Sequence, residues 1–304
     1  MDPSVVDSLD PDTLRTVLPG FLSRFYASDT IRSANRERME ALVHQWTDPQ
    51  VAELLTSLKR DTSRFQRYAA DPAGRELSRC WTRDAIASHT LHGIEHLQQA
   101  AESHPTVVLC NHLSYIDASA TDAILAWNGL DTLANRLTFA AGPKVFQHLF
   151  RKVAATCLNT ILVPQSTALS HTDRLSQREL ALRAVQSMKS ARNALQEGSI
   201  LWIYPEGTRS RTGRMGSFIK GVHRYLTLVP DTQVIPAFIC GTERLMSVDH
   251  DEAVHPGPVA LTFLPGIDVQ EGNDGREFLL QARRRITSAI PEEYRSLSQS
   301  NDWV

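Results

Sequence analysis

Short apolar runs alternate with longer amphipathic stretches over residues 105–265. Residues 106–110 read Thr-Val-Val-Leu-Cys, a continuous apolar run typical of a strand buried on both faces. Similar runs lie at residues 137–141, 160–163, 200–204, 233–238 and 259–263. Helical stretches separate most of these runs, and this alternation predicts an α/β fold with a mainly parallel central sheet flanked by helices.

The clearest of the helical stretches covers residues 176–197. Ser176 and Glu179 match a capping box at its start, and Gly198 follows its end as a helix stop. Its apolar positions are predicted to form one stripe, made of Leu180, Ala184, Val185, Met188, Ala191 and Leu195.

The first 85 residues show helical periodicity and no strand candidate. Leu14, Leu18 and Phe25 have the spacing of one helix, and similar patterns continue through residues 39–46 and 51–58. A further long helix is predicted for residues 76–103. We therefore expect a helical N-terminal accessory domain at residues 1–85 and an α/β domain at residues 86–304.

Composition narrows the class of protein. The chain of 304 residues is 42% apolar and 22% charged, with a formal net charge of −2, which argues against a nucleic-acid partner. No apolar run approaches the roughly 20 residues that span a bilayer, and the N-terminus lacks a signal peptide's pattern. Four scattered cysteines lack metal-ligand spacing and favour reduced thiols. We expect a soluble or peripheral membrane protein of the cytoplasm or a plastid-like stroma.

The first chemical motif follows the run at residues 106–110. His112 and Asp117 are an imidazole and a carboxylate, the usual parts for removing a proton from a hydroxyl. They can meet if His112 lies in the loop and Asp117 in the first turn of the next helix, so that Asp117 fixes the imidazole tautomer. The alternative is a loop histidine beside a carboxylate that only stabilises a helix N-terminus.

The second motif follows the run at residues 200–204. Residues 204–211 read Tyr-Pro-Glu-Gly-Thr-Arg-Ser-Arg, which places Arg209 and Arg211 on a turn that Gly207 permits. Guanidinium groups grip phosphate through a bidentate fork, and Lys220 is a further candidate ligand. The alternative is a solvated basic loop.

Both motifs follow predicted strand ends, where ligands gather in parallel sheets. We therefore expect them in one site, ninety residues apart in sequence. The chain has no Gly-x-Ser-x-Gly elbow, Walker loop, His-Glu-x-x-His zinc helix or dinucleotide-binding Gly-x-Gly-x-x-Gly, so those chemistries lack support.

The two linked motifs, His-x4-Asp and Pro-Glu-Gly-Thr-Arg-Ser, resemble those of the glycerolipid acyltransferase superfamily, which includes glycerol-3-phosphate and lysophosphatidate acyltransferases. Residues 141–144, 218–221 and 234–237 are similar to further family blocks, so the resemblance covers about residues 105–265. It implies transfer of an acyl chain from acyl-CoA or acyl carrier protein to a glycerol phosphate hydroxyl, without metal or organic cofactor. Peripheral contact with a membrane would suit a lipid product.

The resemblance also implies residue roles. His112 would be the general base and Asp117 its orienting partner, while Arg209 and Arg211 would hold the phosphate. Backbone N–H groups near Glu206 and Gly207 would stabilise the oxyanion. The full set of expected substrate-binding residues is Glu206, Gly207, Thr208, Arg209, Arg211, His171 and Lys220.

The chain departs from many family members in a segment that bears on the identity of the acceptor. They carry an arginine after the strand that matches residues 160–163, where this chain reads Pro164-Gln165-Ser166. The loop at residues 170–173, which contains His171, is instead similar to soluble plastid glycerol-3-phosphate acyltransferases. We therefore expect glycerol 3-phosphate as acceptor, with its 1-acyl form as the alternative. A non-catalytic acyl-lipid binding protein and a thioesterase are the rival functions.

Overall fold

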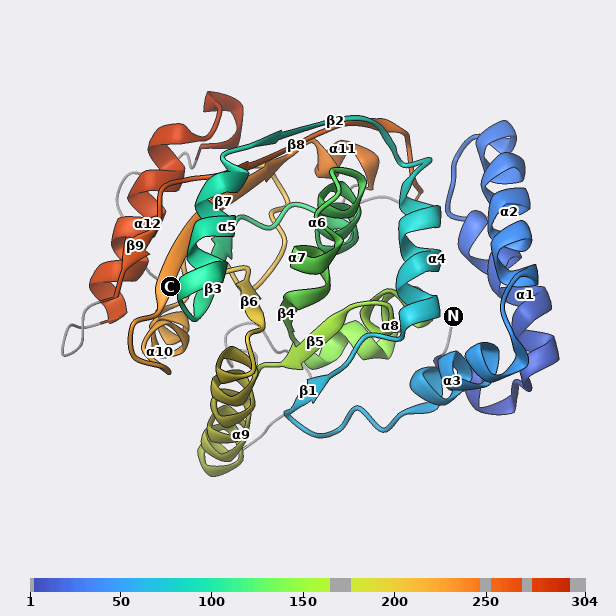
Figure 1. The fold of residues 1–304 in the computed structure, drawn as a ribbon, viewed down its shortest axis with the longest axis horizontal. Coiled ribbons are helices and arrows are strands. Elements are labelled where there is room, and N and C mark those ends of the chain that lie inside the picture. The colour runs from blue at the N-terminus through green and yellow to red at the C-terminus, as the bar shows by residue number, and fades with distance from the viewer. Residues whose placement is uncertain (1–2, 165–175, 247–252, 270–274, 296–304) are drawn as a thin grey trace.

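The computed structural model describes residues 3–164, 176–246, 253–269 and 275–295 (Figure 1). Within them a nine-stranded sheet runs in the order β1-β5-β4-β6-β3-β7-β8-β2, and β9 pairs with β7. The strands are β1 (Arg67–Tyr68), β2 (Ile86–His92), β3 (Thr106–Cys110), β4 (Leu137–Ala141), β5 (Asn159–Leu162), β6 (Ile200–Ile203), β7 (Gln233–Cys240), β8 (Gly257–Phe263) and β9 (Ile267–Asp268).

Helices surround this sheet. The α-helices are α1 (Pro11–Ser23), α2 (Asp29–His44), α3 (Asp48–Lys59), α4 (Pro72–Thr82), α5 (Ile94–Ser103), α6 (Asp117–Trp127), α7 (Asp131–Arg136), α8 (Leu149–Thr156), α9 (Gln177–Gln196), α10 (His223–Leu226), α11 (Thr242–Leu245) and α12 (Gly275–Ala289). Short 3-10 helices are η1 (Pro3–Ser8), η2 (Pro143–Gln147), η3 (Lys220–Val222) and η4 (Glu292–Tyr294). No helix in the described part of the chain is long and apolar enough to cross a membrane.

The six strands predicted from apolar runs are all present, as β3 to β8. Every residue of β3 is buried, and β3 pairs in parallel with both β6 and β7. β4 likewise pairs in parallel with β5 and β6, whereas the β1–β5, β7–β8 and β7–β9 pairs are antiparallel. The predicted α/β class with a mainly parallel sheet is therefore confirmed.

The prediction of one helix over residues 76–103 was wrong, because α4 and α5 flank a strand there. β2 is the edge strand beside β8, and most of its side chains are at least partly exposed, so it lacks a continuous apolar run. Gly93 follows it with a φ of 64°, and a Cβ there would lie 2.1 Å from the carbonyl oxygen of Phe263. This close approach requires glycine. The two-residue strand β1, at the other edge, also lies where we expected helices alone.

The N-terminal helices pack directly on the α/β part of the chain. In Figure 1, α1, α2 and α3 lie together at one end, and α4 stands between them and the sheet. One hydrophobic cluster contains Leu14 and Leu54 from these helices together with Val108 and Phe263 from the sheet. The division into two domains at residue 85 stays a prediction.

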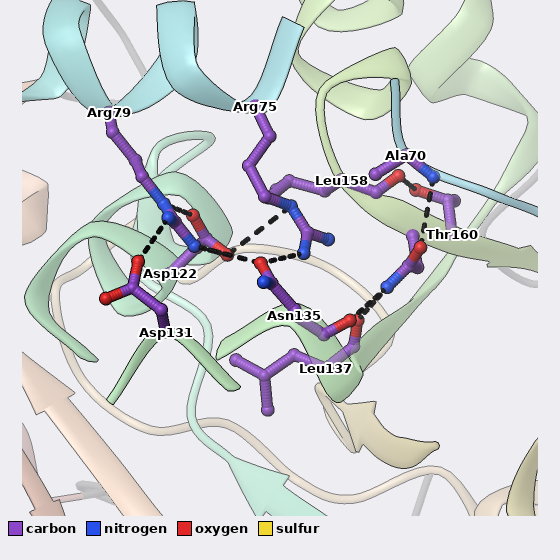
Figure 2. A network of polar contacts seen from close by, with 10 residues as sticks. Ala70, Arg75, Arg79, Asp122, Asp131, Asn135, Leu137, Leu158 and Thr160 are labelled. Atoms are coloured by element: carbon purple, nitrogen blue, oxygen red, sulfur yellow. Dashed lines mark hydrogen bonds and ion pairs between the residues drawn. The ribbon is translucent and has the colours of Figure 1, made fainter. Parts of the chain in front are cut away.

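Polar contacts fix α4 onto α6 and α7 (Figure 2). The Nε of Arg79 donates to Asp122 at 2.7 Å, and its Nη1 donates to Asp131 at 2.8 Å. Arg75 donates to the side-chain oxygen of Asn135 at 2.7 Å. Since Asp122 is buried on α6, these bonds hold in place the helix that begins at Asp117.

Candidate active site

The two sequence motifs meet at the carboxyl ends of β3 and β6, which are neighbours in the sheet. The backbone N–H of Ser210 donates to the carbonyl oxygen of His112 at 2.7 Å. The backbone N–H of His112 in turn donates to Oε1 of Glu206 at 2.9 Å. The expected juxtaposition of residues ninety apart in sequence is therefore present, and two hydrogen bonds join the loops.

His112 and Asp117 make the expected contact. Nδ1 of His112 lies 2.7 Å from Oδ2 of Asp117, the first residue of α6. The same carboxylate oxygen accepts from the backbone N–H groups of Leu113 at 2.7 Å and Ser114 at 3.0 Å. Because this oxygen already accepts two backbone hydrogen bonds, it acts as an acceptor toward the ring as well and selects the tautomer in which Nδ1 carries the hydrogen. Nε2 of His112 is then the free base.

The imidazole also rests on an aromatic ring that sequence reasoning missed. The rings of His112 and Tyr204 are stacked, with centroids 4.1 Å apart and an angle of 15° between planes. Tyr204 is the last residue before the second motif's turn, so each motif supplies one ring. Together with the bond to Asp117, the stacking fixes both the rotation and the tilt of His112.

Buried polar side chains hold the loop that carries His112. The amide of Asn111 donates to the carbonyl oxygen of Ile239 at 2.9 Å and accepts from its N–H at 2.8 Å, as a backbone partner in the sheet would. Ser114 donates to the carbonyl oxygen of Met246 at 2.8 Å. The loop is thereby fixed to β7 and to the segment after α11, independently of any substrate.

Glu206, which we expected at the substrate, is instead buried beneath the two loops. Its Oε1 accepts from the N–H of His112, and its Oε2 accepts from the N–H of Gly216 at 2.6 Å. Burial raises the pKa of Glu206 to about 7, against the lowering effect of these two bonds. It is not among the described residues that line the cavity, so it positions His112 rather than contacting a ligand.

A cavity of about 950 Å³ opens beside His112. One part of its wall is apolar, with Phe139, Phe150, Ala154, Leu180 and Met188 among the lining residues. Six cationic side chains line it and no carboxylate does, within the part of the chain that the structure describes. The cations are Lys144, Arg151, Arg209, Arg211, Lys220 and Arg224. In a chain with a net charge of −2, this concentration of positive charge suits an anionic amphiphile.

Two of these cations are held on the ring of Tyr115. The guanidinium carbon of Arg209 lies 3.1 Å from the ring centroid and that of Arg151 lies 3.6 Å from it. Two planar guanidiniums cannot share one face at those distances, so the ring lies between them. Both line the cavity, where each can bind an anionic group of a ligand. Arg151 comes from α8, outside both sequence motifs.

The other expected residues fall in two groups. Gly207, Thr208, Arg211 and Lys220 all line the cavity. His171 lies outside the described residues. The N–H of Gly207 donates to the carbonyl oxygen of Tyr204 at 3.0 Å and so closes the turn. The expected oxyanion donors near Glu206 and Gly207 stay a prediction.

Comparison with known proteins adds the family. A family model described as Acyltransferase matches residues 88–240. A 1-acyl-sn-glycerol-3-phosphate acyltransferase of Limnanthes douglasii is 36% identical over 112 residues, covering 36% of this chain and 38% of the relative. A putative 1-acyl-sn-glycerol-3-phosphate acyltransferase of Caenorhabditis elegans is 24% identical, covering 68% of each chain. The match thus spans less than two fifths of the plant relative's length.

Among solved structures, the chain is similar to the 1-acyl-sn-glycerophosphate acyltransferase PlsC of Thermotoga maritima. The sequence identity is 18% and the TM-score is 0.49, with 90% of this chain and 94% of the other covered.

Proposed function

The chain belongs to the acyltransferase family, and we propose that it transfers a fatty acyl group from a thioester donor to the free hydroxyl of 1-acylglycerol 3-phosphate. This acceptor was the second of our two sequence-based expectations. The names of the relatives favour it over glycerol 3-phosphate. The apolar part of the cavity wall suits a fatty acyl chain, which the thioester donor carries with either acceptor.

The observation that carries the proposal is the position of His112. Its Nδ1 is bound to Asp117, and the residue lines a cavity with six cations. Nε2 removes the proton of the acceptor hydroxyl as its oxygen attacks the thioester carbonyl carbon. When the carbon–sulfur bond breaks, the imidazolium returns that proton to the departing sulfur, giving the ester and a thiol. Asp117 stabilises the imidazolium between the two steps.

The phosphate of the acceptor binds to cations of the cavity wall, with Arg209, Arg211 and Lys220 as its ligands and Arg151 held on the same Tyr115 ring as Arg209. A phosphate fixed there holds the hydroxyl near His112, and such orientation accounts for a large part of the rate in bimolecular transfers. The donor is acyl-CoA or acyl carrier protein. Lys144 and Arg224 are further cations for the phosphate groups that either donor carries.

A direct test compares acceptors with the purified protein and palmitoyl-CoA, or palmitoyl carrier protein if the CoA thioester is not used. We expect phosphatidate as product, by mass spectrometry, and a higher kcat/KM for 1-acylglycerol 3-phosphate than for glycerol 3-phosphate. The reverse order would restore the first expectation. Thiol release that ignores both acceptors would identify a thioesterase, and ligand binding without thiol release from either donor would identify a binding protein.

A further inference from the structure

Two large apolar side chains stand exposed one turn apart on α9. Leu182 is 55% exposed and Val185 is 59% exposed. We expected Val185 in the buried stripe of this helix, where Ala191 and Leu195 do lie. Isolated exposed aliphatic residues are ordinary, but two adjacent ones on a helix whose opposite side is buried form a small second apolar surface.

Cations flank this pair along the helix. Arg178, Leu182, Val185, Lys189 and Arg192 follow one another at spacings of four and three residues, so they share one face, and all five are exposed. We call them the α9 stripe. The single carboxylate within α9 is Glu179, which is bound to Ser176 in the capping box. The stripe is therefore apolar at its centre and positive on both sides.

The stripe adjoins the cavity. Ala181 is exposed and also lines the cavity, and Leu180, Ala184 and Met188 from the same helix line it further in. The exposed Arg224 of α10 lines the cavity as well. The hydroxyl groups of Ser187 and Tyr225 lie 2.9 Å apart and join the two helices. Whatever covers the stripe therefore lies against a helix that forms part of the cavity wall.

We infer that the α9 stripe docks on the surface of a bilayer that contains anionic lipid. Leu182 and Val185 would enter the boundary between headgroups and acyl chains, while Arg178, Lys189 and Arg192 pair with lipid phosphates. Positive charge on both copies opposes a second copy of this chain as occupant, because like charges would face each other. If the proposed function holds, an acyl-bearing acceptor passes from the membrane into the cavity along α9.

Vesicle flotation tests the inference without any turnover. The protein is mixed with vesicles of phosphatidylcholine alone, or with about one third phosphatidylglycerol. We expect binding to the anionic vesicles that weakens with added salt, and a loss of about tenfold or more in the double variant Leu182→Ala/Val185→Ala. Val17→Ala is the matched control, because Val17 is 44% exposed on α1, which lies well away from α9 in Figure 1.

The inference is overturned if the protein does not bind anionic vesicles, or if the double variant binds as well as the Val17→Ala protein. A stripe that instead holds two copies of the chain together would overturn it as well. Light scattering would then give a dimer mass for wild type and a monomer mass for the double variant. Activity on a short-chain, monomeric acceptor tests the proposed acyltransferase function separately from membrane docking, since Leu182 and Val185 do not line the cavity. We expect the double variant to keep that activity and to lose activity on acceptor embedded in vesicles.

Discussion

Two buried carboxylates on one helix, Asp117 and Asp122 of α6, have opposite surroundings. Asp122 faces permanent cations, with Arg79 at 2.7 Å and Arg75 at 3.7 Å (Figure 2). Asp117 faces two backbone N–H groups and the ring of His112. Guanidiniums neutralise Asp122 at all times, so its role is to join α4 to α6. The charge on Asp117 meets a full positive charge when His112 gains a proton, which the proposed mechanism places during acyl transfer.

The largest expected effect is on Asp117. Asp117→Asn leaves a side chain of the same shape but no longer selects the Nδ1–H tautomer or stabilises the imidazolium. By analogy with other histidine–carboxylate pairs, we expect kcat to fall by about a thousandfold or more. Folding should change much less, which urea unfolding would check. A kcat within tenfold of wild type would remove Asp117 from the mechanism.

Asp122→Asn should have the opposite effect, with a large loss of stability and little change in kcat. Removing one partner of a buried charge pair leaves guanidiniums without their counter-charge, and we expect a loss of about 3–5 kcal/mol in the free energy of unfolding. The kcat of the folded protein should stay near that of wild type. Asp131→Asn is the matched control, because Asp131 also accepts from Arg79 but is exposed, and its loss should cost less than about 1 kcal/mol. Equal losses in the two variants would contradict the account.

Glu206 is a third buried carboxylate, and its ionisation destabilises the folded protein. Its pKa is raised by burial from 4.5 to about 7, so the folded protein holds this proton more tightly than the unfolded chain does. The associated stability is fully present below pH 4.5 and is lost as the pH rises through about 7. Relative to Glu206→Gln, wild type should lose up to about 3 kcal/mol across that window.

Urea unfolding of both proteins at several pH values measures this difference. Glu179→Gln serves as control, because Glu179 is exposed and its pKa is lowered rather than raised. Parallel pH profiles for wild type and Glu206→Gln would show that Glu206 carries no such cost.

The smallest expected effect concerns the acceptor. Arg209→Ala removes a charge-assisted contact to phosphate, and we expect the KM for 1-acylglycerol 3-phosphate to rise by roughly ten- to a hundredfold, with a smaller change in kcat. Arg151→Ala should act in the same direction, since its guanidinium also lines the cavity. Steady-state kinetics at saturating donor checks this. An unchanged KM in both variants would place the phosphate elsewhere.

The features that could be predicted from the sequence are those set by local patterns of residues. β3 to β8 were predictable because strands buried on both faces are continuous apolar runs, whereas β2 was missed because only an edge strand can be so polar. The contact between His112 and Asp117 was predictable because it spans a single strand-to-helix turn. The position of Glu206 was not, since its partners are backbone N–H groups of His112 and Gly216, which carry no sequence signal. Arg151 reaches Tyr115 only through the packing of α8.

The most direct test of the central claim measures thiol release from acyl-CoA, with acyl carrier protein as the second donor, by wild type and His112→Ala. Each protein is assayed with and without 1-acylglycerol 3-phosphate. The account predicts release by wild type only when the acceptor is present, and none above background by His112→Ala. The urea unfolding transition of His112→Ala should match that of wild type. Acceptor-dependent release by His112→Ala at a rate near that of wild type would contradict the assignment of His112 as the general base.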